Sequence, residues 1–449
     1  MGRKGHFMSE TSTDTIRIPI DTIRVNIPGL KETGTFYSED APDVLCVECE
    51  PEHAYTGPCL KCGCIDSYKA NGFADVRRIH DVSIGIYAVD LYFKGRRYKC
   101  RDCGGTFGDP VDFAKSGYWM TNRLIETIQR ESVYHTFTTV ARKYGISISW
   151  VQRIFMEHAK EFEDRRVVKA PEVLGIDEVH ICDQMRLVLT DSENGILLDM
   201  YPGNTKQFVK RAIESMEGYE NIKYVTIDMA TGYRNTVERM LPNAMIIVDR
   251  FHVVRYISSA SQSAKKEIVE RLKLSVDAME DGPDKIRKQN LLTRLGKKAI
   301  LFKYNNQKIK EDSVKSAFLM ELCMEFPELD ELYQVKINAE NIYDISTTAE
   351  EALENFKTFK KSIPARGKAY KDFRDFAKMF ENWEPEILNY FRSGRRLTNA
   401  ATEGLNSDIK SINNSGKGYS FKVLRAKCLI NQYLKGKSRN LKSRKKLKQ

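Results

Sequence analysis

The 449-residue chain lacks any apolar run that approaches the roughly 18 residues of a membrane span. Its first residues also lack the apolar core of a secretory signal, so we expect a cytoplasmic protein. Core-forming residues are plentiful: 41% of the chain is hydrophobic and 10% is aromatic, which excludes wholesale disorder. At about 100–200 residues per domain, the length predicts about three domains.

Acidic residues are scarce at the C-terminal end of the chain. The whole chain has a net charge of +11, whereas segment 391–449 has 16 Lys and Arg against two acids, a net +14, which leaves −3 for residues 1–390. Residues 435–449 include eight basic residues and no acid. This pattern indicates either a disordered, solubilising tail or an arm that contacts nucleic-acid phosphates.

Cysteine is unevenly distributed, since seven of the ten cysteines lie between Cys46 and Cys103. Disulfides are rare in the cytoplasm, so the clustering favours a metal site. Two CxxC pairs can present four thiolates to one structural zinc ion. The two pairs with this spacing predict a zinc site made of Cys59, Cys62, Cys100 and Cys103.

The chain between the two pairs alternates apolar and polar residues over 82–93, and Gly95 suits a hairpin turn. We expect these strands to fold back and bring the two CxxC pairs together. A third CxxC pair, Cys46 and Cys49, competes with them for zinc. Cys64 is too close in sequence to Cys62 to be an obvious fourth ligand.

Residues 120–162 change to a helical periodicity. Segment 136–144 is followed by Gly145 and then by a helix whose N-cap is predicted to be Ser147. A short helix, a glycine-containing turn and a second helix are typical of a helix-turn-helix, whose second helix enters a DNA groove. The side chains that this helix would offer to DNA are Ser149, Trp150, Gln152 and Arg153. The alternative is a helical linker without DNA contacts.

After Pro171 the sequence predicts an α/β layered domain. Short apolar runs at 173–177, 186–190, 195–199, 223–228 and 244–249 read as strands, with helical segments at 206–216 and 231–241. Three of these runs end in an acid, namely Asp177, Asp228 and Asp249. A single aspartate at a strand end is commonly a turn or cap residue, but three favour a ligand site at the carboxyl edge of the sheet.

Carboxylates that crowd one edge repel one another unless cations join them. Mg²⁺ prefers oxygen ligands and binds few carboxylates together with substrate phosphates. Two such ions can activate an attacking oxygen and stabilise a leaving one in phosphoryl displacement. The acids therefore favour a metal-dependent reaction at a phosphodiester.

Residues 251–392 are predominantly helical and highly charged, which is too long for a loop and predicts an inserted helical domain. The following segment places Glu403, Asn406 and Lys410 on one helical face at spacings i, i+3 and i+7. An acid beside an amide and a lysine, in the most basic part of the chain, suits contact with metal and phosphate.

Together these motifs resemble bacterial insertion-sequence transposases of the DDE class, close to the ISL-three family. The more specific signatures are Asp249-Arg-Phe-His252 and Glu403-Gly-Leu-Asn406. The cysteine-rich ribbon, the helix-turn-helix and Gly175-Ile-Asp177-Glu178 match the family in the same order.

The resemblance implies a multidomain fold with an α/β RNase H-like catalytic core, and two catalytic ions of Mg²⁺ or Mn²⁺. Asp177 matches the first catalytic acid and Glu403 the last. In an RNase H-like sheet the fourth strand lies beside the first, so Asp228 is the preferred second acid and Asp249 its rival. The resemblance gives DNA or structural contacts to Arg250 and His252, and the remaining DNA contacts are expected from Asn406 and Lys410.

The resemblance also implies the domain order along the chain. We expect an N-terminal segment (1–35), a zinc ribbon (36–112), a helix-turn-helix (118–165), a core in two parts (170–255 and 393–434) around an all-α insertion (256–392), and a basic tail (435–449).

The implied activity is metal-dependent cleavage of double-stranded DNA at terminal inverted repeats, with strand transfer into target DNA. A homodimer or higher assembly, associated with the nucleoid, would carry it out. Two alternatives stay open: a catalytically inactive, transposase-derived, sequence-specific DNA-binding regulator, and a structure-specific nuclease on the same core.

Overall fold

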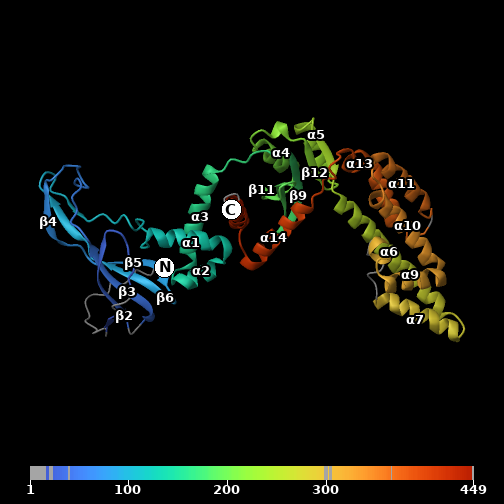
Figure 1. Ribbon diagram of the computed structural model, residues 1–449, viewed down its shortest axis with the longest axis horizontal. Coiled ribbons are helices and arrows are strands. Elements are labelled where there is room, and N and C mark those ends of the chain that lie inside the picture. Colours follow the sequence, from blue (N-terminus) through green and yellow to red (C-terminus); the bar gives the residue numbers. More distant parts are fainter. Residues whose placement is uncertain are drawn as a thin grey trace, which may run out of the picture. The chain divides into compact units, whose positions relative to one another are not determined.

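The computed structural model describes residues 17–19, 24–38, 41–297, 302, 306–365 and 367–446 (Figure 1). The chain divides into two compact units, Met1–Arg165 and Arg166–Gln449. Each unit has its own sheets, helices and buried core.

The N-terminal unit contains a five-stranded sheet in the order β1-β2-β3-β6-β5. Its strands are β1 (Arg17–Pro19), β2 (Leu30–Ser38), β3 (Ala41–Pro51), β6 (Tyr87–Phe93) and β5 (Arg77–Ile84). The expected division into a segment 1–35 and a ribbon 36–112 does not match this sheet, because β2 spans residue 35. Alternating apolar residues of β3, β5 and β6 explain the sheet, since they bury one common face.

The hairpin of this sheet turns at a different glycine from the expected one. Strands β5 and β6 are joined at Gly85, which has a φ of 59°. Gly95, where the turn was expected, instead connects β6 to β7 (Arg96–Cys100) of a second sheet. A tight turn with a positive φ favours glycine. The sequence has a glycine at both positions, so it did not show which of the two forms the turn.

The second sheet of this unit has three strands in the order β4-β7-β8, with β4 spanning Tyr68–Phe73 and β8 Thr106–Gly108. Its small core is aromatic. Tyr55, Tyr68, Tyr98 and Phe107 pack with ring centroids 5.2–6.2 Å apart. This sheet carries Cys100 at the end of β7.

Three helices follow where the sequence periodicity predicts them: α1 (Asn122–Tyr134), α2 (Phe137–Tyr144) and α3 (Ile148–Arg165). Thr121 and Thr136 cap the first two helices by accepting hydrogen bonds from the backbone. Gly145 ends α2 in the left-handed region at φ 63°. The hydroxyl of Ser147 accepts from the Trp150 N–H at 3.4 Å, as the predicted cap requires.

The second unit is built on a five-stranded sheet in the order β11-β10-β9-β12-β13. Its strands are β9 (Val173–Ile181), β10 (Gln184–Asp191), β11 (Ile196–Tyr201), β12 (Tyr224–Ile227) and β13 (Met245–Val248). Strands β9, β12 and β13 are parallel to one another, and β10 runs antiparallel to both of its neighbours, β9 and β11. The helices around it include α4 (Lys206–Glu214), α5 (Thr231–Met240) and α14 (Ala400–Gly416), with a short 3-10 turn at Tyr219–Asn221.

Strand β9 is longer than the apolar run that predicts it. It continues to Ile181, so Asp177 lies inside the strand rather than at its end. Val179 and Ile181 are buried and continue the strand past the acid by pairing with β10.

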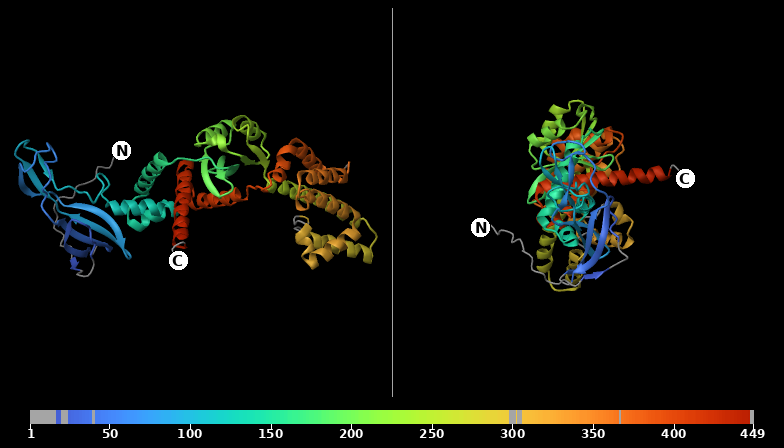
Figure 2. Two further views of the ribbon diagram at one scale, coloured as in Figure 1. Left: turned by 45° about the horizontal axis from the view of Figure 1, so that its top comes forward. Right: turned by 90° about the vertical axis from the view of Figure 1, so that its left-hand side faces the viewer.

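The described residues of the predicted insertion form eight helices, several of which are labelled in Figure 1 and seen again in Figure 2. They are α6 (Arg250–Asp277), α7 (Pro283–Lys297), α8 (Asn306–Lys310), α9 (Ser313–Glu325), α10 (Pro327–Asp344), α11 (Ala349–Ser362), α12 (Lys371–Asn382) and α13 (Glu384–Arg392). Helix α6 begins directly after β13 and crosses the expected boundary at residue 255 without a break. Its buried residues belong to one hydrophobic core that continues from the sheet into the insertion.

The C-terminal helix α15 runs from Phe421 to Lys446 (Figure 2). Helix α15 thus extends through residues 435–446 of the expected basic tail, and 447–449 lie outside the described residues. Lysine, arginine and leucine are good helix formers and no proline interrupts the segment, so the helix continues. Among the described residues, no helix combines the length and apolar character needed to cross a bilayer.

Candidate active site and metal centre

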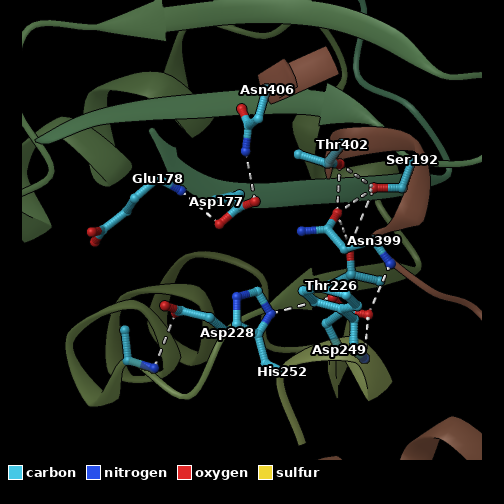
Figure 3. Close-up of polar contacts among 12 residues, drawn as sticks. Asp177, Glu178, Ser192, Thr226, Asp228, Asp249, His252, Asn399, Thr402 and Asn406 are labelled. Carbon is cyan, nitrogen blue, oxygen red and sulfur yellow. Dashed lines mark hydrogen bonds and ion pairs between the residues drawn. The ribbon is translucent and has the colours of Figure 1, made fainter. Parts of the chain in front are cut away.

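Three predicted acids follow neighbouring positions of the parallel strands in the second unit. Ile227 at the end of β12 pairs with Ile176 of β9 on one side and with Val248 of β13 on the other. In each case the residue that follows is the acid. Asp177, Asp228 and Asp249 therefore lie side by side at the same edge of the sheet (Figure 3). Strand register therefore brings together residues separated by up to 72 positions in the sequence.

Asp177 is buried, with 6% of its surface exposed. One carboxylate oxygen accepts from the Glu178 N–H at 2.7 Å, and the other accepts from Asn406 Nδ2 at 2.9 Å (Figure 3). Burial raises the pKa of Asp177, and the charges of Asp249 and Glu178 add to that rise, while His252 and the Glu178 N–H oppose it. The carboxylate is held in place by neutral donors, and no basic side chain among the described residues pairs with it directly.

Asp228 is partly buried at the start of the turn into α5. Burial first, then the charges of Glu178 and Asp177, raise the pKa of Asp228 to about 6, against the opposing charge of His252. Its Oδ1 accepts from the Ala230 N–H at 3.2 Å. Within the described part of the chain, its second oxygen has no hydrogen-bond partner, so it is available to a ligand.

Asp249 is fully buried, and both of its carboxylate oxygens are occupied. Oδ1 accepts from the N–H groups of Phe251 at 3.3 Å and Asn399 at 3.1 Å, and Oδ2 lies 3.3 Å from Nδ1 of His252. This carboxylate caps helix α6 and fixes the chain just before α14. The hydrogen bond with Asp249 raises the pKa of His252, with burial opposing it.

Glu403 lies in the first turn of α14. Its carboxylate belongs, with Asp249 and His252, to a group whose ligand atoms all lie within 4.8 Å of one another. Burial and then the charge of Asp249 raise the pKa of Glu403, while His252 and Arg255 lower it. Helix α14 thus brings the last predicted acid to the edge where the strands bring the others.

The donor set fits divalent cations. The carboxyl groups of Asp177, Asp228 and Glu403 all have raised pKa values, and burial is the largest cause in each case. Mutual repulsion adds to burial, and the charge of His252 lowers the pKa of all three groups. Hard oxygen ligands and unbalanced negative charge are what Mg²⁺ or Mn²⁺ would neutralise.

A buried network of hydroxyl groups lies beside the acids and was not anticipated from the sequence. The Oδ1 atom of Asn399 accepts from Thr402 Oγ1 at 2.6 Å and from Ser192 Oγ and Thr226 Oγ1, both at 3.2 Å. Thr190 joins it through Thr402 at 2.6 Å. The network ties β10, the following turn, β12 and α14 together beside the acids, and Figure 3 shows its members Ser192, Thr226, Asn399 and Thr402.

Gly175 makes room for this network. A Cβ atom there would lie 2.2 Å from Ser192 Oγ, 2.3 Å from Thr190 Oγ1 and 2.8 Å from Asn399 Oδ1. The available sequence signal was the presence of threonines within apolar strands, but nothing in a single sequence shows that they meet Asn399.

Glu178 is a second unanticipated neighbour of the site. Its carboxylate accepts a hydrogen bond from the Tyr233 hydroxyl on α5. Burial and this hydrogen bond raise the pKa of Tyr233. Tyr233 therefore holds Glu178 close enough for its charge to act on Asp228.

The other residues predicted to contact DNA in this unit have different surroundings. Arg250 pairs with Asp344 at 3.1 Å and lies over the Tyr343 ring, so it has an intramolecular partner. Asn406 is buried on Asp177. Lys410 is exposed, two helical turns after Glu403.

On α3, the predicted DNA contacts divide into exposed and packed side chains. Ser149 and Gln152 are exposed. Trp150 packs on Tyr118 with a centroid separation of 5.2 Å, and the exposed Arg153 lies over both rings while pairing with Glu157 at 3.2 Å. Trp150 therefore has a packing role that its position in the sequence did not indicate.

The four predicted zinc ligands converge in the N-terminal unit. The Sγ atoms of Cys59, Cys62, Cys100 and Cys103 all lie within 4.8 Å of one another. Four sulfurs at about 2.3 Å from a tetrahedral zinc are separated by about 3.8 Å, and Cys62 Sγ and Cys100 Sγ lie 3.8 Å apart. The donors and their spacing therefore fit a structural zinc ion.

Two further observations refine this centre. Cys64, which seemed badly placed in the sequence, has its Sγ 3.3 Å from those of both Cys62 and Cys100. Cys46 and Cys49 both lie within strand β3, where residues three apart point to opposite faces and cannot converge on one ion. They are buried, and Cys49 belongs to the core of the five-stranded sheet.

Comparisons with known proteins identify the family. A model of the ISL-three type of DDE proteins, described as a transposase, matches residues 174–428. The chain is also 23% identical over 357 residues to the transposase for insertion sequence element IS1001 of Bordetella parapertussis, covering 77% of this chain and 81% of that protein.

Proposed function

Because the chain belongs to the ISL-three family of DDE transposases and thus functions in DNA transposition, we propose that it cuts its element at the terminal inverted repeats. The freed 3′-hydroxyl would then be joined to target DNA. The reaction would depend on Mg²⁺ or Mn²⁺ held by Asp177, Asp228 and Glu403.

The observation that carries this proposal is the convergence of acidic side chains at one sheet edge, with too few basic side chains among the described residues to neutralise them. Asp177 and Asp228 lie side by side because β9 and β12 are parallel neighbours, and α14 adds Glu403. The strand order, in which the fourth strand lies beside the first, supports an RNase H-like core. Clustered acids with raised pKa values in one place favour a functional site.

Hydrogen bonding favours Asp228 over Asp249 as the second catalytic acid. Asp228 accepts one hydrogen bond and has an oxygen free for a ligand. Asp249 is closer to Glu403, but its oxygens already accept from Phe251, Asn399 and His252. We therefore assign Asp249 a positioning role, in which it holds His252 and the residue before α14.

Divalent ions, when bound, would supply the charge that activates the attacking oxygen and stabilises the leaving one. The side chains of the protein would provide orientation. Asn406 would fix the carboxylate of Asp177, and the network around Asn399 would fix the start of α14 and thereby Glu403. Positioning of this kind accounts for much of the catalysis of phosphoryl transfer.

In the N-terminal unit we propose that zinc stabilises the three-stranded sheet and that α2 and α3 act as a helix-turn-helix that reads the repeats. Ser149, Gln152 and Arg153 have the exposure that base or phosphate contacts require. Metal analysis should find about one zinc per chain. We further propose that the protein acts as a homodimer or a higher assembly.

The direct test is cleavage and joining of DNA that carries the element ends, with added Mg²⁺. Asp177→Asn, Asp228→Asn and Glu403→Gln should each lose at least about a thousandfold in rate, because each removes a charged ligand of the ions. The matched control is Glu238→Gln, which removes an exposed acid on α5 and should retain wild-type activity. Wild-type protein that binds the ends tightly but never cuts them would instead indicate a DNA-binding regulator.

A further inference from the structure

A basic cleft lies in the N-terminal unit between the loop after β4, the start of β5 and strand β7. It is open and has a volume of about 510 Å³, within the range of sites that accept a small ligand. The side chains that give it chemical character are Arg77, Arg78, Arg97, Trp119 and Asp75. None of them was predicted from the sequence to bind DNA.

The cleft carries positive charge that the protein does not neutralise. Arg78 pairs with Asp90 at 2.6 Å. Arg77 and Arg97 are exposed, and neither has an acidic partner in the described ranges of the chain. With Arg78 paired to Asp90, Arg77 and Arg97 against the single lining acid Asp75 leave a net charge of +1. Guanidinium groups of this kind suit phosphate oxygens.

Trp119 presents a large aromatic surface beside these arginines. Its side chain is 57% exposed, although its neighbours Tyr118 and Met120 are only 4% and 2% exposed. Its φ is 53°, in the left-handed region that bulky residues rarely adopt.

The backbone around Trp119 is held to strand β5. The His80 N–H donates to the Trp119 carbonyl at 2.8 Å, and the Thr121 N–H donates to the His80 carbonyl at 2.9 Å. The main chain that carries the exposed indole is therefore fixed by hydrogen bonds and by buried neighbours. A strained backbone that holds an exposed aromatic ring in place is a feature of binding sites.

The surface next to the cleft repeats the same chemistry. Phe73 at the end of β4 is 52% exposed, and Lys94 Nζ lies 4.8 Å from the centre of its ring. Strand β4 is exposed along most of its length. Aromatic side chains interleaved with basic ones are the arrangement by which proteins bind nucleic-acid strands with exposed bases.

We propose that the cleft binds DNA through an unstacked nucleotide, whose base lies on the indole of Trp119 while Arg77 and Arg97 contact the flanking phosphates. The inference rests on the action of the family on DNA but not on the assignment of the catalytic acids. It adds a contact with single-stranded or distorted DNA to the duplex contacts proposed for α3.

The test is equilibrium binding of the full-length protein, without added Mg²⁺ or Mn²⁺, to three labelled DNAs: a single strand, the same strand with abasic positions, and the matching duplex. Stacking contributes about 1–3 kcal/mol per base, so Trp119→Ala should weaken binding to the intact strand by roughly 5- to 150-fold. Binding to the abasic strand and to the duplex should change little. Trp119→Phe retains an aromatic face and should recover most of the affinity.

Arg97→Gln should weaken binding to both the intact and the abasic single strand, because its phosphate contact does not need the base, and should reduce the slope of the salt dependence by about 1. Binding to the duplex should change little. The matched control is Arg239→Gln, which removes one exposed positive charge from α5. Unchanged zinc content and thermal unfolding would show that each variant is folded.

Either of two results would overturn the proposal: an unchanged affinity of Trp119→Ala for the intact strand, or an equal loss on the intact and abasic strands. Because no cleavage is measured, the outcome is independent of whether Asp177, Asp228 and Glu403 are catalytic.

Discussion

Buried acids have opposite surroundings in the two units. In the N-terminal unit, Asp90 is 2% exposed and is paired with Arg78 and His80, whose hydrogen bonds hold its pKa below the ordinary value despite burial. In the second unit, Asp177 and Asp228 lack a directly paired basic side chain among the described residues, and their pKa values are raised. Burial is common to both, so the presence of a partner distinguishes a structural acid from a candidate metal ligand.

The same distinction applies to other acids. Asp81 is buried in the five-stranded sheet and accepts from Arg123 and from the Thr121 hydroxyl, which joins β5 to the start of α1. Asp199 on β11 pairs with Arg425 at 2.7 Å and with Arg166. These acids hold elements together, whereas those at the edge of β9 and β12 repel one another.

One substitution made in both regions should therefore have opposite effects on stability. Asp81→Asn should destabilise the protein by about 3 kcal/mol, because it leaves the partly buried guanidinium of Arg123 without its charged partner. Thermal unfolding of the full-length, zinc-loaded protein measures the change. A fall in midpoint no larger than that of Glu238→Gln would show that the pair does not stabilise the unit.

Asp228→Asn should instead stabilise the metal-free protein, by an amount of the order of 1–3 kcal/mol, because it removes a charge that burial and neighbouring acids disfavour. The same variant should lose most of the stabilisation that added Mg²⁺ gives the wild type. Thermal unfolding with and without Mg²⁺ tests both effects. Destabilisation of the metal-free protein would contradict the assignment of Asp228 as an unpaired acid.

The raised pKa of Asp228 also predicts how metal binding depends on pH. With a folded-state pKa of about 6, the carboxyl group is protonated below that pH, and an ion must displace the proton. The apparent affinity for Mg²⁺ should fall by up to about tenfold for each pH unit below 6 and level off above it. Titration of Mg²⁺ at several pH values gives the profile, and Asp228→Asn should flatten it.

The stability of the metal-free protein should depend on pH in the opposite direction to the metal affinity. The unfolded chain ionises this carboxyl near its ordinary value of 3.8, before the folded protein does. The free energy of unfolding contributed by this group should therefore fall as pH rises from about 4 to 6. A contribution that rises across this window would indicate a paired acid like Asp90.

The smallest expected effect concerns the hydroxyl network. Thr226→Val is nearly isosteric and removes one donor to Asn399, so it should raise the Mg²⁺ concentration needed for half-maximal cleavage several-fold while the protein stays folded. Thr236→Val, which removes a hydroxyl bonded within its own helix α5, is the matched control. Equal metal dependence in the two variants would show that the network does not position the site.

Much of the second unit could be predicted because its elements follow local patterns. Apolar runs marked all five strands of its sheet, and helical periodicity marked the insertion. The assignment of Asp177, Asp228 and Glu403 as metal ligands came from strand ends and family motifs and stays a prediction. Asp177 and Asp228 lie side by side because of strand register, which a single sequence does not encode locally.

Other features required long-range packing. The network around Asn399 joins residues up to 212 positions apart, and nothing near Thr190 in sequence indicates Thr402. The five-stranded N-terminal sheet was not predicted, because the Cys46–Cys49 pair in β3 has the spacing of metal ligands as well as the alternation of a strand. Residues 435–446 were predicted to be a basic tail from their charge alone. Their lysines, arginines and leucine also favour a helix, and α15 extends through them.

The measurement that tests the central claim most directly is a count of bound Mn²⁺ by electron paramagnetic resonance in the full-length, zinc-loaded protein. The wild type and Glu238→Gln should bind Mn²⁺ equally, and Asp249→Asn should retain binding. Asp228→Asn should lose most of the Mn²⁺ binding, because the substitution removes the carboxylate that would be neutralised by the ion and not by a basic side chain of the described residues. Wild-type binding by Asp228→Asn together with its loss in Asp249→Asn would contradict the account and make Asp249 the second metal ligand.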